Sequence, residues 1–170
     1  RGFTYHIYNR ANNWDLMFFD PWNYDHFMRL IEKYLLPVAD IYAYCFIPNH
    51  FHLLVRFKDL VELDDDVDIE RPLSKYLSDC FNAYTKKVNR NYKRRSSLFQ
   101  KIFKRKRVTT KNYLLNLFKY IHHNPVKHGI TEDFSVYIYS SFQEYLSDCA
   151  TNLNKDFILM MFDDFENFAA

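Results

Sequence analysis

Hydrophobic positions along the chain predict several strands. Residues 3–10 (FTYHIYNR) are rich in aromatic and β-branched side chains, which is typical of a strand. Residues 41–47 form an unbroken apolar run, which indicates a buried strand, and Pro48 with Asn49 is a turn signal. Residues 50–57 then alternate, with the apolar side chains on one face at Phe51, Leu53, Val55 and Phe57. The short separation of the last two strands predicts an antiparallel hairpin.

Helical spacing predicts the helices between and after these strands. Asp20 and Pro21 have the chemistry of a helix start, and Pro37 should end this first helix. Pro72 opens a second helix that runs to about residue 89. A third begins after Thr109 or Thr110. It should end at residues 124–125 because a residue before proline disfavours the α conformation. Residues 156–168 suggest one more helix.

A short strand near residues 106–109 completes the order strand, helix, strand, strand, helix, strand, helix. The first six elements match a ferredoxin-like β-α-β-β-α-β unit, so we expect an α+β sandwich with an added C-terminal helix. Residues 1–130 should form the catalytic domain. Residues 131–170 should form an acidic helical tail packed on or beside it, with eight acids and one lysine. Fold alone assigns no function.

Composition excludes several classes of protein. The chain of 170 residues is 48% hydrophobic and 26% charged, which is too apolar for a disordered protein. With only two glycines it contains no Gly-rich phosphate-binding motif. No apolar run is long enough for a membrane span, and no signal peptide is visible. Three widely spaced cysteines indicate reduced thiols, so we expect a cytoplasmic protein with no membrane partner.

Charge is segregated along the chain, although the net charge is only +2. Residues 86–111 contain twelve Lys and Arg and no acid, whereas residues 59–70 contain seven acids and no base. A basic block interleaved with aromatic side chains suits single-stranded nucleic acid, which offers phosphates and unstacked bases. Partial neutralisation by the acidic segments is the competing explanation.

Two short segments have candidate chemistry. His50 and His52 alternate along a strand, so both imidazoles project from one face and could hold a divalent cation. Tyr120 and Asn124 are four residues apart on a helix and share a face. Buried, hydrogen-bonded histidines and an aromatic side chain that flanks the core are the simpler interpretations of each segment alone.

The segments YAYCFIPNHFHLLV (residues 42–55) and YIHHNPVKHG (residues 120–129) together resemble the REP-associated tyrosine transposases, a group of single-tyrosine HUH transposases. Further matches are YHIYNR (residues 5–10), SLFQKIFKRKRV (residues 97–108) and YSSFQEYL (residues 139–146). Residues 127–129, which follow NPV, and the acidic residues 59–70 depart from the family pattern.

The resemblance implies a function. Tyr120 would be the nucleophile, and His50, His52 and Asn124 would hold Mg²⁺ or Mn²⁺, which favour such mixed ligands. The enzyme would cleave and rejoin single-stranded or hairpin DNA through a 5′-phosphotyrosine, as a monomer or homodimer. The predicted DNA-binding residues are basic: Arg10, Lys86, Lys87, Arg90, Arg94, Arg95, Lys104, Arg105, Lys106, Arg107 and Lys119.

Two other functions fit parts of the sequence. The first is a non-catalytic ferredoxin-like binder of single-stranded nucleic acid, in which aromatic side chains such as Tyr42, Tyr44 and Phe46 would stack on bases. The second is a zinc hydrolase that uses His50 and His52 with the pair at residues 122–123.

Overall fold

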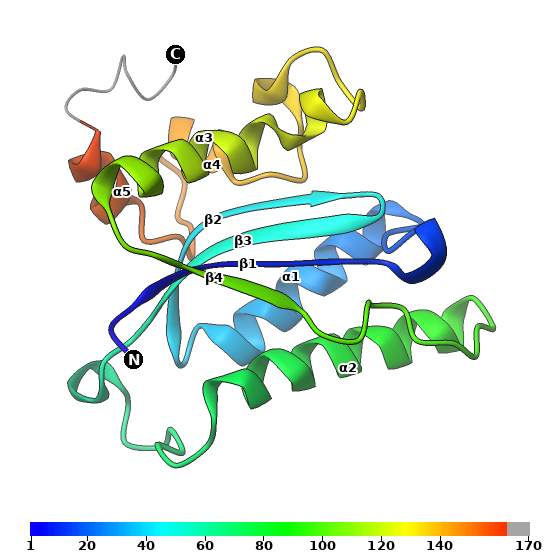
Figure 1. The fold of residues 1–170 in the computed structure, drawn as a ribbon, viewed down its shortest axis with the longest axis horizontal. Helices are drawn as coiled ribbons and strands as arrows, with labels where there is room; N and C mark the ends of the chain where they lie inside the picture. Colours follow the sequence, from blue (N-terminus) through cyan, green and yellow to red (C-terminus); the bar gives the residue numbers. More distant parts are fainter. Residues whose placement is uncertain (163–170) are drawn as a thin grey trace.

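The computed structural model describes residues 1–162, which form a mixed α/β fold around one sheet (Figure 1). The strands are β1 (Thr4–Arg10), β2 (Ala39–Ile47), β3 (His50–Phe57) and β4 (Lys104–Val108), all antiparallel, in the order β2-β3-β1-β4. The α-helices of the described residues are α1 (Pro21–Leu35), α2 (Leu73–Asn91), α3 (Lys111–Lys127), α4 (Phe142–Leu146) and α5 (Lys155–Met161). The order of the first six elements and the β2–β3 hairpin are as predicted.

Helices cover both faces of the sheet. In Figure 1, α1 and α2 lie on one side, and α3 lies on the other with α4 and α5. Strand alternation decides which side chains go where. Phe51 is fully buried towards α1 and α2, with ring centroids 5.1 Å from Phe27 and 5.3 Å from Phe81. The neighbouring histidines of β3 therefore face α3.

Most predicted boundaries hold within two residues. α1 begins at Pro21 after a capping box at Asp20 and ends two residues before Pro37. β3 starts and ends where the alternation predicted, while β2 and β4 each begin two residues earlier than expected. The acidic segment is a loop with one short 3₁₀ turn, Leu60–Glu62, whose last residue pairs with Arg56.

The predicted end of the third helix is wrong. α3 continues through Pro125 to Lys127, and the backbone N–H of His128 still donates to the carbonyl of Asn124 at 3.0 Å. Pro125 is buried in this last turn, and its packing outweighs the local preference of the residue before proline. The helix ends ahead of Gly129, whose φ of +66° suits the left-handed position after a helix.

The segment after α3 returns to the outer edge of β2. Backbone bonds join Phe46 to Tyr139, Tyr44 to Ser141, and Ile41 to Asn154. The short helix α4 was not predicted. α5 begins one residue before the predicted start and ends at Met161, and residues 163–168 of that prediction lie outside the described residues. Within residues 1–162, no helix combines the length and apolar character that crossing a membrane requires.

Candidate active site

The site begins with two histidines on β3. His50 and His52 project from the face of the sheet that α3 covers, and they are 5% and 4% exposed. Their ring centroids are 5.2 Å apart. The alternation of the strand therefore brings both imidazoles to one place, as the sequence predicted.

His50 is held in one tautomer. Its Nδ1 lies 2.7 Å from Asn49 Oδ1, so Nδ1 carries the proton and donates to that oxygen. Its Nε2 lies 3.4 Å from Asn124 Oδ1. The Asn124 amide group points elsewhere, because Nδ2 donates to the Tyr120 carbonyl at 3.0 Å. Two acceptor atoms, Nε2 and Oδ1, thus face each other with no proton between them.

His52 is also fixed through its Nδ1, which lies 2.8 Å from His6 Nε2. The other nitrogen of the ring, Nε2, is buried and has no hydrogen-bond partner in the described part of the chain. A buried polar atom without a partner is costly, and a cation is one way to satisfy it. His6 therefore fixes the orientation of the ring whose free nitrogen is available as a ligand.

Burial keeps these imidazoles neutral. It lowers the pKa of His50 to about 4, and it lowers the pKa of His52 to about 2 with help from His6 and His50. The Asn124 carboxamide lies within hydrogen-bonding reach of both rings, and this contact raises the pKa of each, in opposition to burial. Neutral imidazole is the form that binds a metal ion.

Tyr120 lies beside this group, one helical turn before Asn124. Its ring centroid is 5.5 Å from that of His52, and the side chain is 38% exposed, so a large substrate can reach it. Lys127 Nζ lies 5.0 Å from the ring centroid of Tyr120. The tyrosine, both histidines and the asparagine therefore meet within one chain.

Tyr120, His50 and His52 line a cleft of about 390 Å³, and Asn124 is buried behind them. Its walls come from β1, β3, α3, the start of β4 and the loop before it. The lining residues are Tyr8, Asn9, Arg10, His50, His52, Gln100, Lys104, Tyr120, Lys127 and His128. The cleft is polar and basic, with no carboxylate in its lining.

The donor set fits a divalent cation. His50 Nε2 and Asn124 Oδ1 are acceptors, because Asn49 holds the His50 proton on Nδ1, and His52 Nε2 is buried without a partner in the described part of the chain. In residues 1–162 no group of three or more His, Cys, Asp or Glu is arranged to hold a metal. A cation held by His50 and His52 would therefore take the carboxamide of Asn124 as its third ligand.

The predicted basic residues divide between several surfaces. Arg10 and Lys104 line the cleft, and Lys106 lies opposite His6 on the same face of the sheet. Arg105 and Arg107 point to the opposite face, where Arg107 covers the Phe3 ring at 3.4 Å. Others do not line the cleft: Lys86, Lys87 and Arg90 on α2, Arg95 in the loop after it, and Lys119 on α3.

Arg94 has a structural partner. It forms an ion pair with Asp15 and its guanidinium lies 5.5 Å from the Phe19 ring centroid. The hydrogen bond from Arg94 lowers the pKa of Asp15. The pair shows that the basic segment is partly neutralised within the protein, by an acid that lies in neither acidic segment.

The structure does not favour the two alternative functions. His122 is not available as a zinc ligand, because both of its ring nitrogens have hydrogen-bond partners. Nδ1 bonds to the Phe118 carbonyl, and Nε2 bonds to Ser141 Oγ. An open aromatic platform on β2 is also absent from the described residues, since Tyr42 and Phe46 are each 1% exposed. Tyr44 donates to Glu144 at 2.6 Å.

Several residues in or next to the cleft had no role in the sequence interpretation or only a minor one. His6 and Tyr8 alternate with Arg10 along β1, which is a signal for a shared face. His128 follows the proline-containing turn, and its ring centroid lies 4.7 Å from that of His50. Gln100 belongs to a loop with no regular pattern, so only the folded chain reveals its place.

Comparisons with known proteins find two that are similar to this chain, both described as REP-associated tyrosine transposases. The chain is 35% identical over 106 residues to a protein of Haemophilus influenzae named as a REP-associated tyrosine transposase. The alignment covers 59% of this chain and 57% of that protein. It also superimposes on the structure of a REP-associated tyrosine transposase bound to a REP hairpin, with a TM-score of 0.68 and 21% identity over 87% of this chain and 81% of the other. No family model matches the chain. The resemblance read from the sequence is thus confirmed, and the aligned region spans little more than half of the curated relative.

Proposed function

We propose that the protein cleaves and rejoins single-stranded DNA, with Tyr120 as the nucleophile and a divalent cation in the adjacent site. One observation carries this proposal: His52 Nε2, which is buried without a partner in the described part of the chain, and the facing acceptors His50 Nε2 and Asn124 Oδ1 lie beside an accessible tyrosine of the same chain. A purely structural histidine pair would pair those acceptors with protein donors.

Mg²⁺ or Mn²⁺ bound at His50, His52 and Asn124 would polarise the scissile phosphate and stabilise its charge. Asn49 and His6 hold the two imidazoles so that their Nε2 atoms stay available. Asn124 is held by its bond to the Tyr120 carbonyl, so the third ligand and the nucleophile move as one unit of α3.

Tyr120 attacks the phosphorus of a DNA phosphodiester. Its phenolic oxygen forms the new bond to phosphorus and gives its proton to water, while the bond from phosphorus to the 3′ oxygen breaks and the departing 3′ oxygen takes up a proton from water. The products are a 5′-phosphotyrosine and a free 3′-hydroxyl. The reverse attack by a 3′-hydroxyl restores a phosphodiester, so strand transfer needs no nucleotide hydrolysis. Lys127 lies where its charge can stabilise the phenolate.

DNA is the substrate that the basic cleft suits. Arg10, Lys104 and Lys127 bring positive charge to the cleft, and no acid in the lining opposes them. The structural neighbour is described as bound to a REP hairpin, so we propose hairpin or single-stranded DNA for this chain as well.

The strand order β2-β3-β1-β4 supports a ferredoxin-like topology. The buried, reduced thiols of Cys45 and Cys80 fit action in the cytoplasm.

The test is a covalent adduct with a labelled oligonucleotide. A hairpin with single-stranded flanks is incubated with Mg²⁺ or Mn²⁺ and analysed on a denaturing gel. We expect an adduct with the natural protein and none with Tyr120→Phe, which lacks only the attacking oxygen. Tyr113→Phe is the matched control, because Tyr113 is on the same helix but outside the cleft. An adduct that survives Tyr120→Phe would contradict the assignment.

A further inference from the structure

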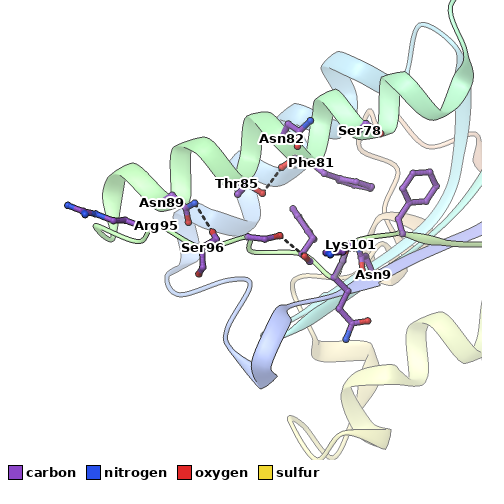
Figure 2. A pocket seen from close by; sticks show the side chains of 13 residues that line it. Asn9, Ser78, Phe81, Asn82, Thr85, Asn89, Arg95, Ser96 and Lys101 are labelled. Atoms are coloured by element: carbon purple, nitrogen blue, oxygen red, sulfur yellow. Dashed lines mark hydrogen bonds between the residues drawn. The ribbon is translucent and has the colours of Figure 1, made fainter.

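A second cavity, of about 460 Å³, lies between α2 and the loop at residues 92–103 (Figure 2). In Figure 2, side chains of α2 and of the loop face each other across it. It shares Asn9 and Gln100 with the cleft at Tyr120, so the two hollows are neighbours on the surface.

The walls of this cavity are held in place by many bonds of the loop. Asn89 Nδ2 donates to the Ser96 carbonyl at 2.9 Å, and Gln100 N–H donates to the Arg10 carbonyl at 2.9 Å. Asn12 Nδ2 donates to the Phe99 carbonyl at 2.7 Å. A cavity with fixed walls binds with a smaller loss of conformational entropy than one that must form on binding.

The lining combines three kinds of group. Phe81, Phe99 and Phe103 form an aromatic cluster, with Phe81 5.1 Å from Phe99 and 5.7 Å from Phe103 between ring centroids. The carboxamides of Asn82 and Gln100 make no side-chain hydrogen bond within the described residues. Arg95 and Lys101 add positive charge, and both are exposed.

One buried atom in this cavity also lacks a partner. Asn89 Oδ1 is buried and accepts no hydrogen bond in the described part of the chain. Its Nδ2 is used by the Ser96 carbonyl, so Oδ1 is an unsatisfied acceptor in the wall of this cavity. The lining has no carboxylate that would repel an anion.

We infer that this cavity binds one unpaired nucleotide of the DNA strand that crosses the cleft at Tyr120. Carboxamides can pair with a base edge, aromatic rings provide apolar contact for the base, and the two cations attract its phosphate. The inference rests on the proposed function, because it gives a binding place to a nucleotide of the same DNA strand that Tyr120 would cleave. Asn9 and Gln100 lie between the two hollows and mark the path that joins them.

The experiment combines removal of single bases from the DNA with substitutions of residues that line the cavity. Single-stranded flanks of the hairpin receive one abasic nucleotide at each position in turn, and binding is measured by fluorescence anisotropy. Asn82→Ala removes one carboxamide, and Asn82→Trp fills the opening from an exposed helix position. Asn91→Ala and Asn91→Trp are the matched controls, since Asn91 is also exposed on α2 but outside the cavity.

We expect one flank position at which the abasic nucleotide weakens binding to the natural protein by about 3- to 10-fold, the loss of about one net hydrogen bond. The same abasic nucleotide should have a smaller effect on Asn82→Ala and no effect on Asn82→Trp, whereas both Asn91 variants behave as the natural protein. Equal abasic effects in all proteins would overturn the inference. If that occurs while the Tyr120 adduct still forms, the proposed function stands. If the natural protein neither binds the hairpin nor forms an adduct, both fall.

Discussion

His6 is the residue whose role can be tested most sharply without touching a proposed ligand. His6→Ala removes the 2.8 Å hydrogen bond to His52 Nδ1 and leaves that buried nitrogen without a partner. Leaving a buried polar group unpaired costs about 1–3 kcal/mol. Partners of metal-binding histidines typically contribute about 10- to 100-fold to metal affinity. We therefore expect the Mn²⁺ affinity of His6→Ala to fall by about 10- to 100-fold.

The assay is calorimetric titration with Mn²⁺, together with cleavage of a hairpin at rising Mn²⁺ concentrations. Excess Mn²⁺ should restore cleavage by His6→Ala, because the ligands themselves remain, but it should not restore cleavage by Tyr120→Phe. His26→Ala is the control, a partly buried histidine of α1 that does not line the cleft. If His6→Ala binds Mn²⁺ within twofold of the natural protein while His52→Ala binds none, His6 only packs against its neighbours and the reasoning is refuted.

Three further predictions concern the metal ligands, the basic residues near the cleft, and the ion pair between Asp15 and Arg94 outside it. Removal of divalent ions with EDTA should abolish cleavage but leave hairpin binding nearly unchanged, and cleavage that persists would contradict the metal site. Lys104→Ala and Lys106→Ala should each reduce the slope of log affinity against log salt by about 0.7 if the lysine neutralises one phosphate of a single strand. Arg94→Ala should leave this slope unchanged, because Arg94 pairs with Asp15. Because Arg94 lowers the pKa of Asp15, this pair stabilises the fold above pH 3.8 and the stabilisation is lost as the pH falls through the lowered value. Urea unfolding should thus show Asp15→Asn less stable than the natural protein at pH 7, with a difference that shrinks in acid.

The strands and helices were predictable where local pattern and packing agree. β3 alternates with its apolar side chains towards α1 and α2, and burial on that face fixes its register against β2. The end of α3 was not predictable from the proline rule, because the burial of Pro125 decides the conformation there. Gly129 carried the correct signal for the helix end.

The candidate site was predictable only in part. The spacing of His50 and His52 places both on one face of a strand, and helical spacing places Tyr120 and Asn124 on one face of a helix, but their roles as nucleophile and ligand came only from the family resemblance. The bonds that give these residues their chemistry cross the fold. His6 and His52 are 46 positions apart, and His50 and Asn124 are 74 apart. No local pattern encodes such pairs.

The basic segment shows the same limit. Its charge suggested one continuous DNA surface, but alternation along β4 sends Lys104 and Lys106 to one face of the sheet and Arg105 and Arg107 to the other. Arg94 is taken by an acid near the start of the chain. Sequence alone gives the amount of charge, and only the fold shows which charges reach the cleft.

The most direct measurement is to identify the residue that carries the DNA. The covalent complex formed with a hairpin substrate is digested with nuclease and protease, and the peptides are sequenced by mass spectrometry. The account predicts a single modified peptide in which Tyr120 carries a nucleotide through its 5′-phosphate. A nucleotide on any other residue, or a cleaved substrate with no modified peptide, would contradict it.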